Sequence, residues 1–269
     1  MMSSIISSSK KFGRNKKLLS ILKPIGAAVF WLLLWEFLYI IVGKDVILPS
    51  PANTAKVIAD VFFTVAFWTP VFNTMFRILE GFLLAVFCGA VFAVITNYSS
   101  LMRALLTPLF SIIKAAPVAS FIILMLIWLP DNAIPVWASF MMVFPIVWGN
   151  VSKGLSNISS DLKDMSKAFK VPFFTRLKRI YIPSVMPYFM AGATTAVGMS
   201  WKAGLAAEVL CTPQSAIGTN LYNAKIYLLT EEVFAWTIVI IILSIIIEKV
   251  FVKLMQRIGK RYNVSEGQA

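Results

Sequence analysis

Six long apolar runs constrain the fold of this chain more than any other feature of its sequence. A transmembrane helix requires about 20 mostly apolar residues, and each run is close to or above that length. Hydrophobic residues make up 59% of the 269 residues and charged residues only 14%, which is too apolar for an ordinary soluble domain. The sequence therefore predicts an all-α membrane protein with six transmembrane helices, at residues 24–42, 71–96, 104–129, 133–151, 184–211 and 233–254.

The basic residues fall on one side of these predicted spans. The chain has 25 Lys and Arg against 12 Asp and Glu, an excess that would suggest nucleic-acid binding in a soluble protein. Here the cations concentrate in the N-terminal tail 1–23, the loop 152–183 and the C-terminal tail 255–269, whereas the alternate loops are balanced or acidic. Cytoplasmic loops carry such an excess of Lys and Arg. We therefore expect a multi-pass protein of the cell membrane with a membrane domain at 24–254, both termini in the cytoplasm and no nucleic-acid partner.

Several kinds of catalytic site lack the residues they need. The sequence contains no histidine, which excludes a His-dependent triad and a metal site built on imidazole. The two cysteines, Cys88 and Cys211, lie in or at the end of apolar runs, where we interpret them as small packed side chains. A membrane enzyme would also need convergent acids at membrane depth, and few carboxylates lie in the spans. We therefore expect that the chain is not an enzyme.

The long basic loop between the fourth and fifth spans is unusual, because transmembrane helices are mostly joined by short loops. Ser160 can cap a helix whose first residue, Asp161, suits the positive end of the helix dipole. Val171-Pro172 should end this helix, and a second short helix should lead into the fifth span. Two interpretations stay open: an amphipathic hairpin that only anchors the fold at the membrane surface, and a docking surface for a soluble motor protein. The predicted apolar face of the first helix consists of Leu162, Met165 and Phe169.

The spacing within this loop resembles the signature loop of bacterial ABC importer permeases. Their pattern is Glu-Ala-Ala, three residues, Gly, nine residues, Ile, one residue, Leu-Pro. From position 164 this chain has Asp-Met-Ser, three residues, Lys170, nine residues, Ile180, one residue, and Ile-Pro ending at Pro183. The spacing is kept throughout. Because Lys170 replaces the glycine, the sequence leaves open whether the turn between the two helices keeps the family's geometry.

Other segments are similar to the nitrate, sulfonate, taurine and bicarbonate branch of that family, and they occur in the family's order. The resemblance extends from about Leu48 to Leu254, most of the chain. The segments are LPSP at 48–51, RILEGF at 77–82, KAAPVAS at 114–120, WKAG at 201–204 with AEV at 207–209, and LYNAKIY at 221–227.

The resemblance implies the type I ABC importer fold, in which two permease copies, by default identical, enclose a pathway in the lipid bilayer. Each copy would seat its cytoplasmic coupling helices on an ABC ATPase subunit, and an extracytoplasmic binding protein would deliver a small anionic or polar solute. The ATP would be bound by the ATPase subunit, since this chain has no GxxxxGK[ST] phosphate loop and so no cofactor of its own. The residues expected at the ATPase contact are Asp164, Met165, Ser166, Phe169, Lys170, Ile180 and Pro183.

Charged residues inside the predicted spans are candidates for the pathway, because a charge in hydrocarbon costs about 2.5–3.5 kcal/mol even on forgiving scales. Arg77 and Glu80 are three apart on one helix face, so we expect them to neutralise each other. Lys202 and Glu208 are six apart and point in different directions. We predict that Lys202, Lys114 and Glu208 face the pathway. The alternative for the two lysines is a salt bridge between helices.

A passive channel or secondary carrier is the alternative function that the composition allows. Secondary carriers often contain a repeated half with broken helices near the midplane, and no internal repeat is evident in this chain. Dependence on an ATPase partner would distinguish the two functions.

Overall fold

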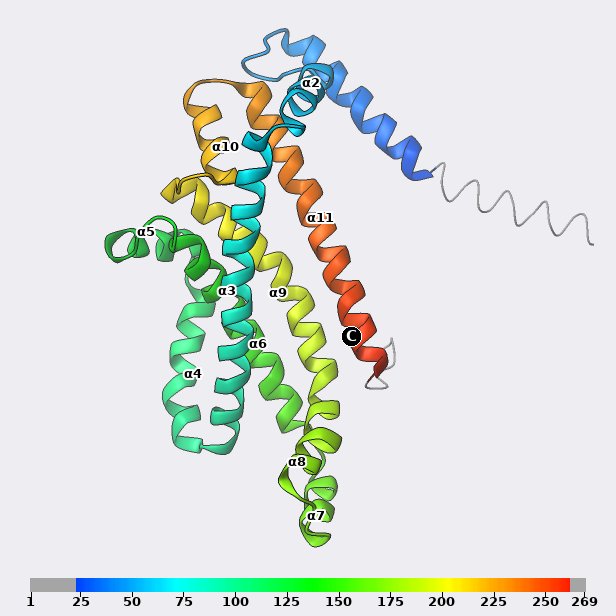
Figure 1. Cartoon of the computed structure of the whole chain (residues 1–269), viewed down its shortest axis with the longest axis vertical. Coiled ribbons are helices and arrows are strands. Elements are labelled where there is room, and N and C mark those ends of the chain that lie inside the picture. The colour runs from blue at the N-terminus through cyan, green and yellow to red at the C-terminus, as the bar shows by residue number, and fades with distance from the viewer. Residues whose placement is uncertain (1–22, 262–269) are drawn as a thin grey trace, which may run out of the picture. The chain divides into compact units, whose positions relative to one another are not determined.

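The computed structural model describes residues 23–261, and these residues form helices joined by short loops, with no strand among them (Figure 1). The first helix is Lys23–Val42. It is followed by α2 (Pro51–Phe62), α3 (Val65–Tyr98), α4 (Ser100–Ala115), α5 (Val118–Trp128), α6 (Ile134–Ser156), α7 (Ser160–Ala168), α8 (Phe173–Arg176), the π-helix η1 (Leu177–Tyr181), α9 (Ile182–Cys211), α10 (Ile217–Ile226) and α11 (Thr230–Arg261).

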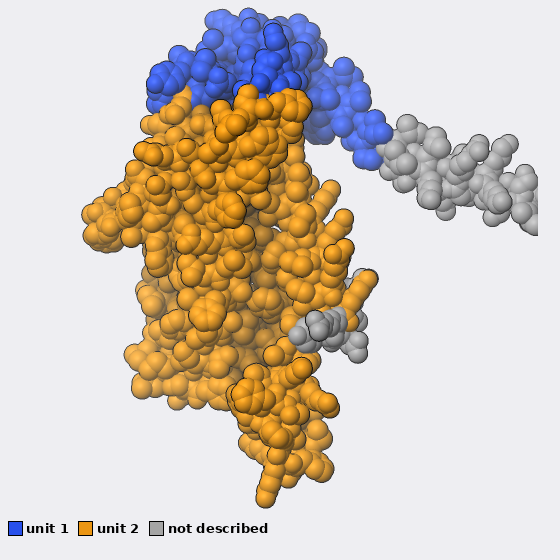
Figure 2. All heavy atoms as spheres, in the orientation of Figure 1, with its two compact units in different colours: residues 1–61, 224–235 blue, residues 62–223, 236–269 orange. Residues whose placement is uncertain are grey.

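The chain divides into two compact units, residues 1–61 with 224–235 and residues 62–223 with 236–269 (Figure 2). In the described part of the smaller unit, segments far apart in sequence are joined by side chains. The indole of Trp35 donates a hydrogen bond to the Pro49 carbonyl (3.0 Å), and its ring lies 5.6 Å from the ring of Phe234. The side-chain amide of Asn53 donates to the carboxylate of Glu231 (3.1 Å).

The core of the larger unit forms where α3, α6 and α9 pack along one another (Figure 1). Small residues let the helix axes approach closely, which is how helices associate in membranes. A β-carbon added at Gly81 of α3 would overlap the Val136 carbonyl of α6, and one at Gly204 of α9 would lie 2.5 Å from Ile78 Cγ1 of α3. Fully buried residues such as Ala85, Val143 and Ala196 continue the interface. These three helices form the frame on which the candidate site is built.

By length and composition, three described helices could cross a membrane: Lys23–Val42, α3 and α6. A fourth is possible if α4 and α5 together form one span. The helices at the fifth and sixth predicted spans, α9 and α11, have 30 and 32 residues. α11 continues through residues 255–261, where a tail was predicted. The predicted tails at 1–22 and 262–269 lie outside the described residues.

The third predicted span, residues 104–129, is not a single straight helix. The structure breaks this segment into α4 and α5, whose axes differ in direction by 104°. Proline has no backbone N–H to donate and disfavours the helical conformation in the residue before it. Ala116 accordingly adopts extended angles (φ −75°, ψ 141°) directly before Pro117, and α5 begins after the proline. Pro117 therefore marks the point where one helix ends and the next begins in a new direction.

Candidate functional site

The segment between α6 and α9 folds as two short helices, as its sequence predicted. α7 begins after Ser159, whose hydroxyl oxygen accepts a hydrogen bond from the Leu162 backbone N–H (3.3 Å). The capping residue is thus Ser159, one position before the predicted Ser160. Asp161 lies in the first turn, where a negative charge is favoured by the helix dipole. The chain leaves the helix before Pro172, and α8 starts directly after it.

Lys170 occupies the left-handed turn that ends α7. Its φ is +48°, a conformation that glycine adopts freely and other residues only at an energetic cost. The Lys170 N–H donates to the Lys167 carbonyl (3.0 Å), and the Val171 N–H donates to the Ser166 carbonyl (3.0 Å). This pair of hydrogen bonds is the Schellman arrangement that usually has glycine at the position of Lys170. In this chain a left-handed turn of this kind forms with lysine at the position where the signature has glycine.

Changing Lys170 to glycine is expected to stabilise this turn by about 1 kcal/mol, because it removes the strain of a β-carbon at positive φ. This value is a net one, since glycine also raises the conformational entropy of the unfolded chain. Hydrogen exchange of the backbone amides at positions 170 and 171 should slow by roughly fivefold. K170A is the matched control, since it also removes the charge but keeps the β-carbon. Equal protection in K170G and K170A would show that strain at Lys170 is not the cause.

The second half of the segment attaches the hairpin to the helical core. η1 is a five-residue π-helix, a geometry that is rare and concentrates at functional sites. Ile180 and Tyr181 pack against the core formed by α3, α6 and α9. Pro183 lies at the start of α9, where the missing N–H of proline costs little. The hairpin is therefore attached directly to the first turn of α9, one of the three helices that form the core.

The apolar side chains of α7 and α8 are largely uncovered. Met165 is 49% exposed, Phe169 77% and Phe174 80%. By contrast, Ser166 is buried, and its hydroxyl donates to the Lys163 carbonyl (2.7 Å). Asp164 approaches Lys167 at 3.7 Å, but both side chains are so exposed that this ion pair adds little stability. In the larger unit, the two helices extend past the ends of α3, α4 and α6, which leaves this apolar face free for a partner (Figures 1 and 2).

The two candidate pathway lysines are both exposed. Lys202 lies on the exposed side of α9, and its neighbours in sequence, Trp201 and Ala203, are buried. Within residues 23–261, no ion pair reaches Lys202 or Lys114. Lys114 stands in the last turn of α4, where the helix dipole favours a cation. The salt bridge between helices that was the alternative for these lysines is not present in the described part of the chain.

Glu208 is in a different environment, and the expected pairing of Arg77 with Glu80 is wrong. Arg77 turns towards α9, where its Nη1 lies 3.5 Å from Glu208 Oε1. Glu80, one turn further along α3, is exposed on the helix surface and takes no part in an ion pair of the described residues. The reason lies in the tertiary structure. Glu208 is fully buried, and a buried carboxylate without a cation is costly. Pairing Arg77 with Glu208 therefore stabilises the fold more than pairing it with the exposed Glu80 on its own helix would. The carboxylate of Glu208, one of the predicted pathway residues, is enclosed by protein in this structure.

Several polar residues that no sequence pattern indicated surround this pair. Arg77 Nη2 donates to the side-chain oxygen of Asn132 (2.8 Å) and to the Gln214 carbonyl (2.9 Å). Glu208 Oε2 accepts hydrogen bonds from the Thr74 hydroxyl (2.9 Å) and from the Gly218 N–H (3.2 Å). A buried glutamate with no cation three or four residues away on its own helix signals partners elsewhere, but a single sequence does not say which helix supplies them.

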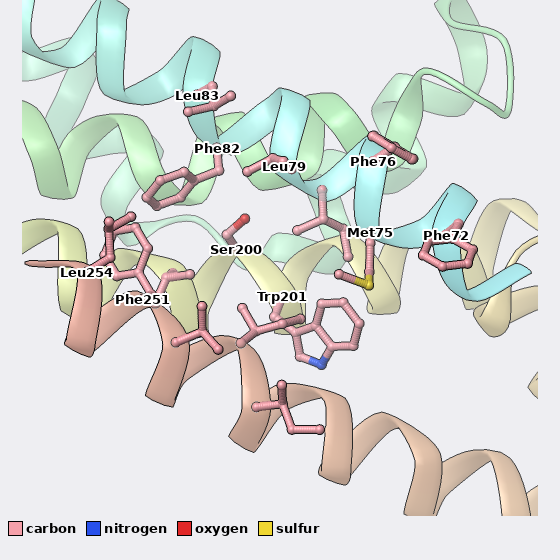
Figure 3. A pocket seen from close by; sticks show the side chains of 15 residues that line it. Phe72, Met75, Phe76, Leu79, Phe82, Leu83, Ser200, Trp201, Phe251 and Leu254 are labelled. Atoms are coloured by element: carbon pink, nitrogen blue, oxygen red, sulfur yellow. The ribbon is translucent and has the colours of Figure 1, made fainter. Parts of the chain in front are cut away.

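A separate groove of about 520 Å³ lies between α3, α9 and α11 (Figure 3). Its walls are almost wholly apolar, with Phe76, Phe82 and Phe251 among the side chains that line it. Ser200 and Trp201 of α9 also border the groove, and both are buried, with no hydrogen-bond partner for either polar side-chain atom. Such a surface suits the hydrocarbon region of a bilayer and offers no charged group to a polar solute.

Residues 81–264, more than half of the chain, match the family described as binding-protein-dependent transport system inner membrane component. The chain belongs to this family. The match confirms the resemblance to ABC importer permeases that the signature spacing indicated, and with it the all-helical membrane class of the fold.

Curated relatives are similar over most of their length. The chain is 26% identical to the nitrate import permease protein NrtB of Synechococcus elongatus, over 78% of this chain and 79% of the relative. It is 26% identical to the bicarbonate transport system permease protein CmpB of Synechocystis, over 80% of both. It is 19% identical to the putative aliphatic sulfonates transport permease protein SsuC of Bacillus subtilis, over 78% of this chain and 76% of the relative.

A solved structure shares the fold. A chain from the crystal structure of an amino acid ABC transporter with histidines superposes with a TM-score of 0.60, although only 14% of the residues are identical. The superposition covers 76% of this chain and 97% of that chain. This likeness supports the helical arrangement alone and says nothing about the solute.

Proposed function

We propose that this chain is the permease subunit of an ATP-driven importer for a small inorganic or organic anion. The observation that carries the proposal is the coupling hairpin at residues 160–181. It keeps the spacing of the family's signature loop, its first helix ends in a left-handed turn at Lys170, and it leaves Met165, Phe169 and Phe174 exposed. Apolar side chains uncovered at the tip of a membrane protein indicate a protein partner, and here the partner is an ABC ATPase subunit.

The transport cycle follows from where the hairpin is attached. ATP binding closes two ATPase subunits, and the hairpins seated on them move together. Because η1 continues directly into α9, this movement is delivered to the first turn of α9. The chain itself does no chemistry on the nucleotide, which is bound and hydrolysed in the partner subunit.

An anionic solute is supported by two observations. The relatives are named for nitrate, bicarbonate and aliphatic sulfonates, all of which carry a negative charge at neutral pH. Lys202 is an exposed cation in the middle of a core helix and takes no part in an ion pair of residues 23–261. An uncompensated charge at membrane depth is expected to face a water-filled pathway or a ligand of opposite charge. We therefore assign Lys202 to the pathway, with Lys114 as a second candidate.

The remaining parts of the proposal concern assembly. Six spans, made by Lys23–Val42, α3, the α4–α5 segment, α6, α9 and α11, put both termini and the coupling hairpin in the cytoplasm. Two copies of the chain enclose the pathway, since a closed two-fold homodimer is the commonest assembly. An extracytoplasmic binding protein delivers the solute, as the description of the family implies.

Uptake by the reconstituted chain tests the function. Proteoliposomes that contain the permease together with its ATPase subunit and binding protein should accumulate labelled nitrate, bicarbonate or an alkanesulfonate only when ATP is supplied to the ATPase. Liposomes with the permease alone should accumulate none of them. Equal uptake without the ATPase would replace the importer with a passive channel or a secondary carrier.

A further inference from the structure

The connection between α9 and α10 is held in place by side chains of α3. We call residues 212–218 the α9–α10 segment. The Asn73 side chain donates a hydrogen bond to the Ser215 carbonyl (3.2 Å), and Arg77 donates to the Gln214 carbonyl (2.9 Å). The Ile217 N–H in turn donates to the Thr74 hydroxyl (3.0 Å). Side chains on one face of α3 thus form hydrogen bonds with the backbone of residues 214, 215 and 217.

The segment depends on these contacts because its own backbone is strained. Thr212 and Ser215 have φ values of +46° and +50°, which residues with a β-carbon adopt only at an energetic cost. Ala216, Ile217 and Gly218 are nevertheless buried. A β-carbon added at Gly218 would overlap the Glu208 side chain, so the segment lies directly on the end of α9. Loss of the contacts from α3 would release strain and expose these residues.

At the centre of this arrangement lies the ion pair between Arg77 and Glu208, in which one atom on each side has no hydrogen-bond partner. Glu208 Oε2 accepts from the Thr74 hydroxyl and the Gly218 N–H, which joins α3, α9 and the segment at one oxygen. Glu208 Oε1 and Arg77 Nη1 face each other at 3.5 Å, and neither atom has a hydrogen-bond partner. A charge-assisted hydrogen bond would be about 2.7–2.9 Å long, so this contact is held by electrostatic attraction alone.

The ion pair and the coupling hairpin lie at opposite ends of one helix. α9 starts directly after η1 and continues for 30 residues to Cys211, with its internal proline, Pro187, in the first turns. At about 1.5 Å per residue the helix is roughly 45 Å long. Glu208 lies in its last turn. Because α9 is one continuous helix, a displacement of the hairpin should also move Glu208 relative to Arg77.

From this geometry we infer that Thr74, Arg77 and Glu208 form a latch, which keeps the α9–α10 segment closed over the end of α9 and opens when α9 moves. The inference rests on the proposed function, because it takes the hairpin as the place where force enters. In the transport cycle, opening of the latch would give access to the pathway at the end remote from the ATPase.

Labelling of a buried cysteine tests the latch. In a background in which Cys88 and Cys211 are changed to serine, Ala216→Cys places a thiol at a position that is fully buried in this structure. E208Q keeps an oxygen for the Thr74 and Gly218 hydrogen bonds but loses the attraction to Arg77. We expect E208Q to raise the rate of labelling by a membrane-impermeant maleimide, in membrane vesicles without nucleotide, about tenfold. T74V keeps both charges, removes the hydroxyl that bonds Glu208 and Ile217, and should raise the rate to a similar extent.

Two controls separate a latch from a general loss of structure. E80Q removes a carboxylate three residues from Arg77 on the exposed side of α3, and it should leave labelling at the wild-type rate. Ala93→Cys reports on a fully buried position further along α3, and it should stay protected in E208Q and T74V. Equal labelling of E208Q and E80Q, or a parallel rise at position 93, would overturn the latch. The assay needs no ATPase, so a failure of the permease to bind an ATPase would refute the proposed function and leave the latch result readable.

Discussion

Replacing both Asp164 and Met165 with arginine is expected to release the ATPase subunit from membranes that contain the permease. Both side chains lie on the exposed face of α7, with Met165 half uncovered. The change puts two cations where the partner is expected to accept an apolar side chain and an acidic one. Burying unpaired charge at the centre of an interface costs several kcal/mol, which weakens binding by at least a hundredfold. Co-purification of the ATPase subunit with the permease measures the loss.

A matched double variant controls for added charge. Ser100 and Leu101 at the start of α4 are also exposed, and the predicted topology puts them on the same side of the membrane. S100R/L101R should insert normally and retain the ATPase subunit. If D164R/M165R retains it equally well, the docking surface lies elsewhere and the exposed face of α7 needs another explanation.

Changing Lys202 to methionine is expected to reduce solute uptake at low solute concentration by about ten- to a hundredfold. Methionine preserves the length and apolar stem of lysine, so the fold should persist on this exposed side of α9. What is lost is a charge-assisted contact with an anion, which is typically worth about 1.5–3 kcal/mol. ATP-dependent uptake, measured over a range of solute concentrations, should show the loss mainly as a higher half-saturating concentration.

Two further variants sharpen this result. K202R retains the positive charge and should recover much of the uptake, whereas K153M removes an exposed lysine near the end of α6 and should change nothing. Normal affinity and normal uptake by stably folded K202M protein would remove Lys202 from the pathway.

The coupling hairpin could be predicted closely because its signals are local. Residue spacing, the apolar face of α7 and the break at Pro172 all depend on near neighbours in sequence. The cap was misplaced by one residue because Ser159 and Ser160 are adjacent serines with the same chemistry. The conformation of Lys170 could not be predicted, since a positive φ at lysine depends on whether the hydrogen bonds from residues 170 and 171 repay the strain.

The apolar lengths and the charge distribution by themselves determined that the chain belongs in a membrane, because burial in hydrocarbon depends on composition over about 20 residues. Only the tertiary structure decided that Arg77 bonds Glu208 instead of Glu80, and that the third predicted span bends by 104° after Ala116. Spacing along a helix says which residues can meet on its surface. It does not say which buried charged group on another helix lies within reach. Here the buried carboxylate of Glu208 on α9 determines the partner of Arg77.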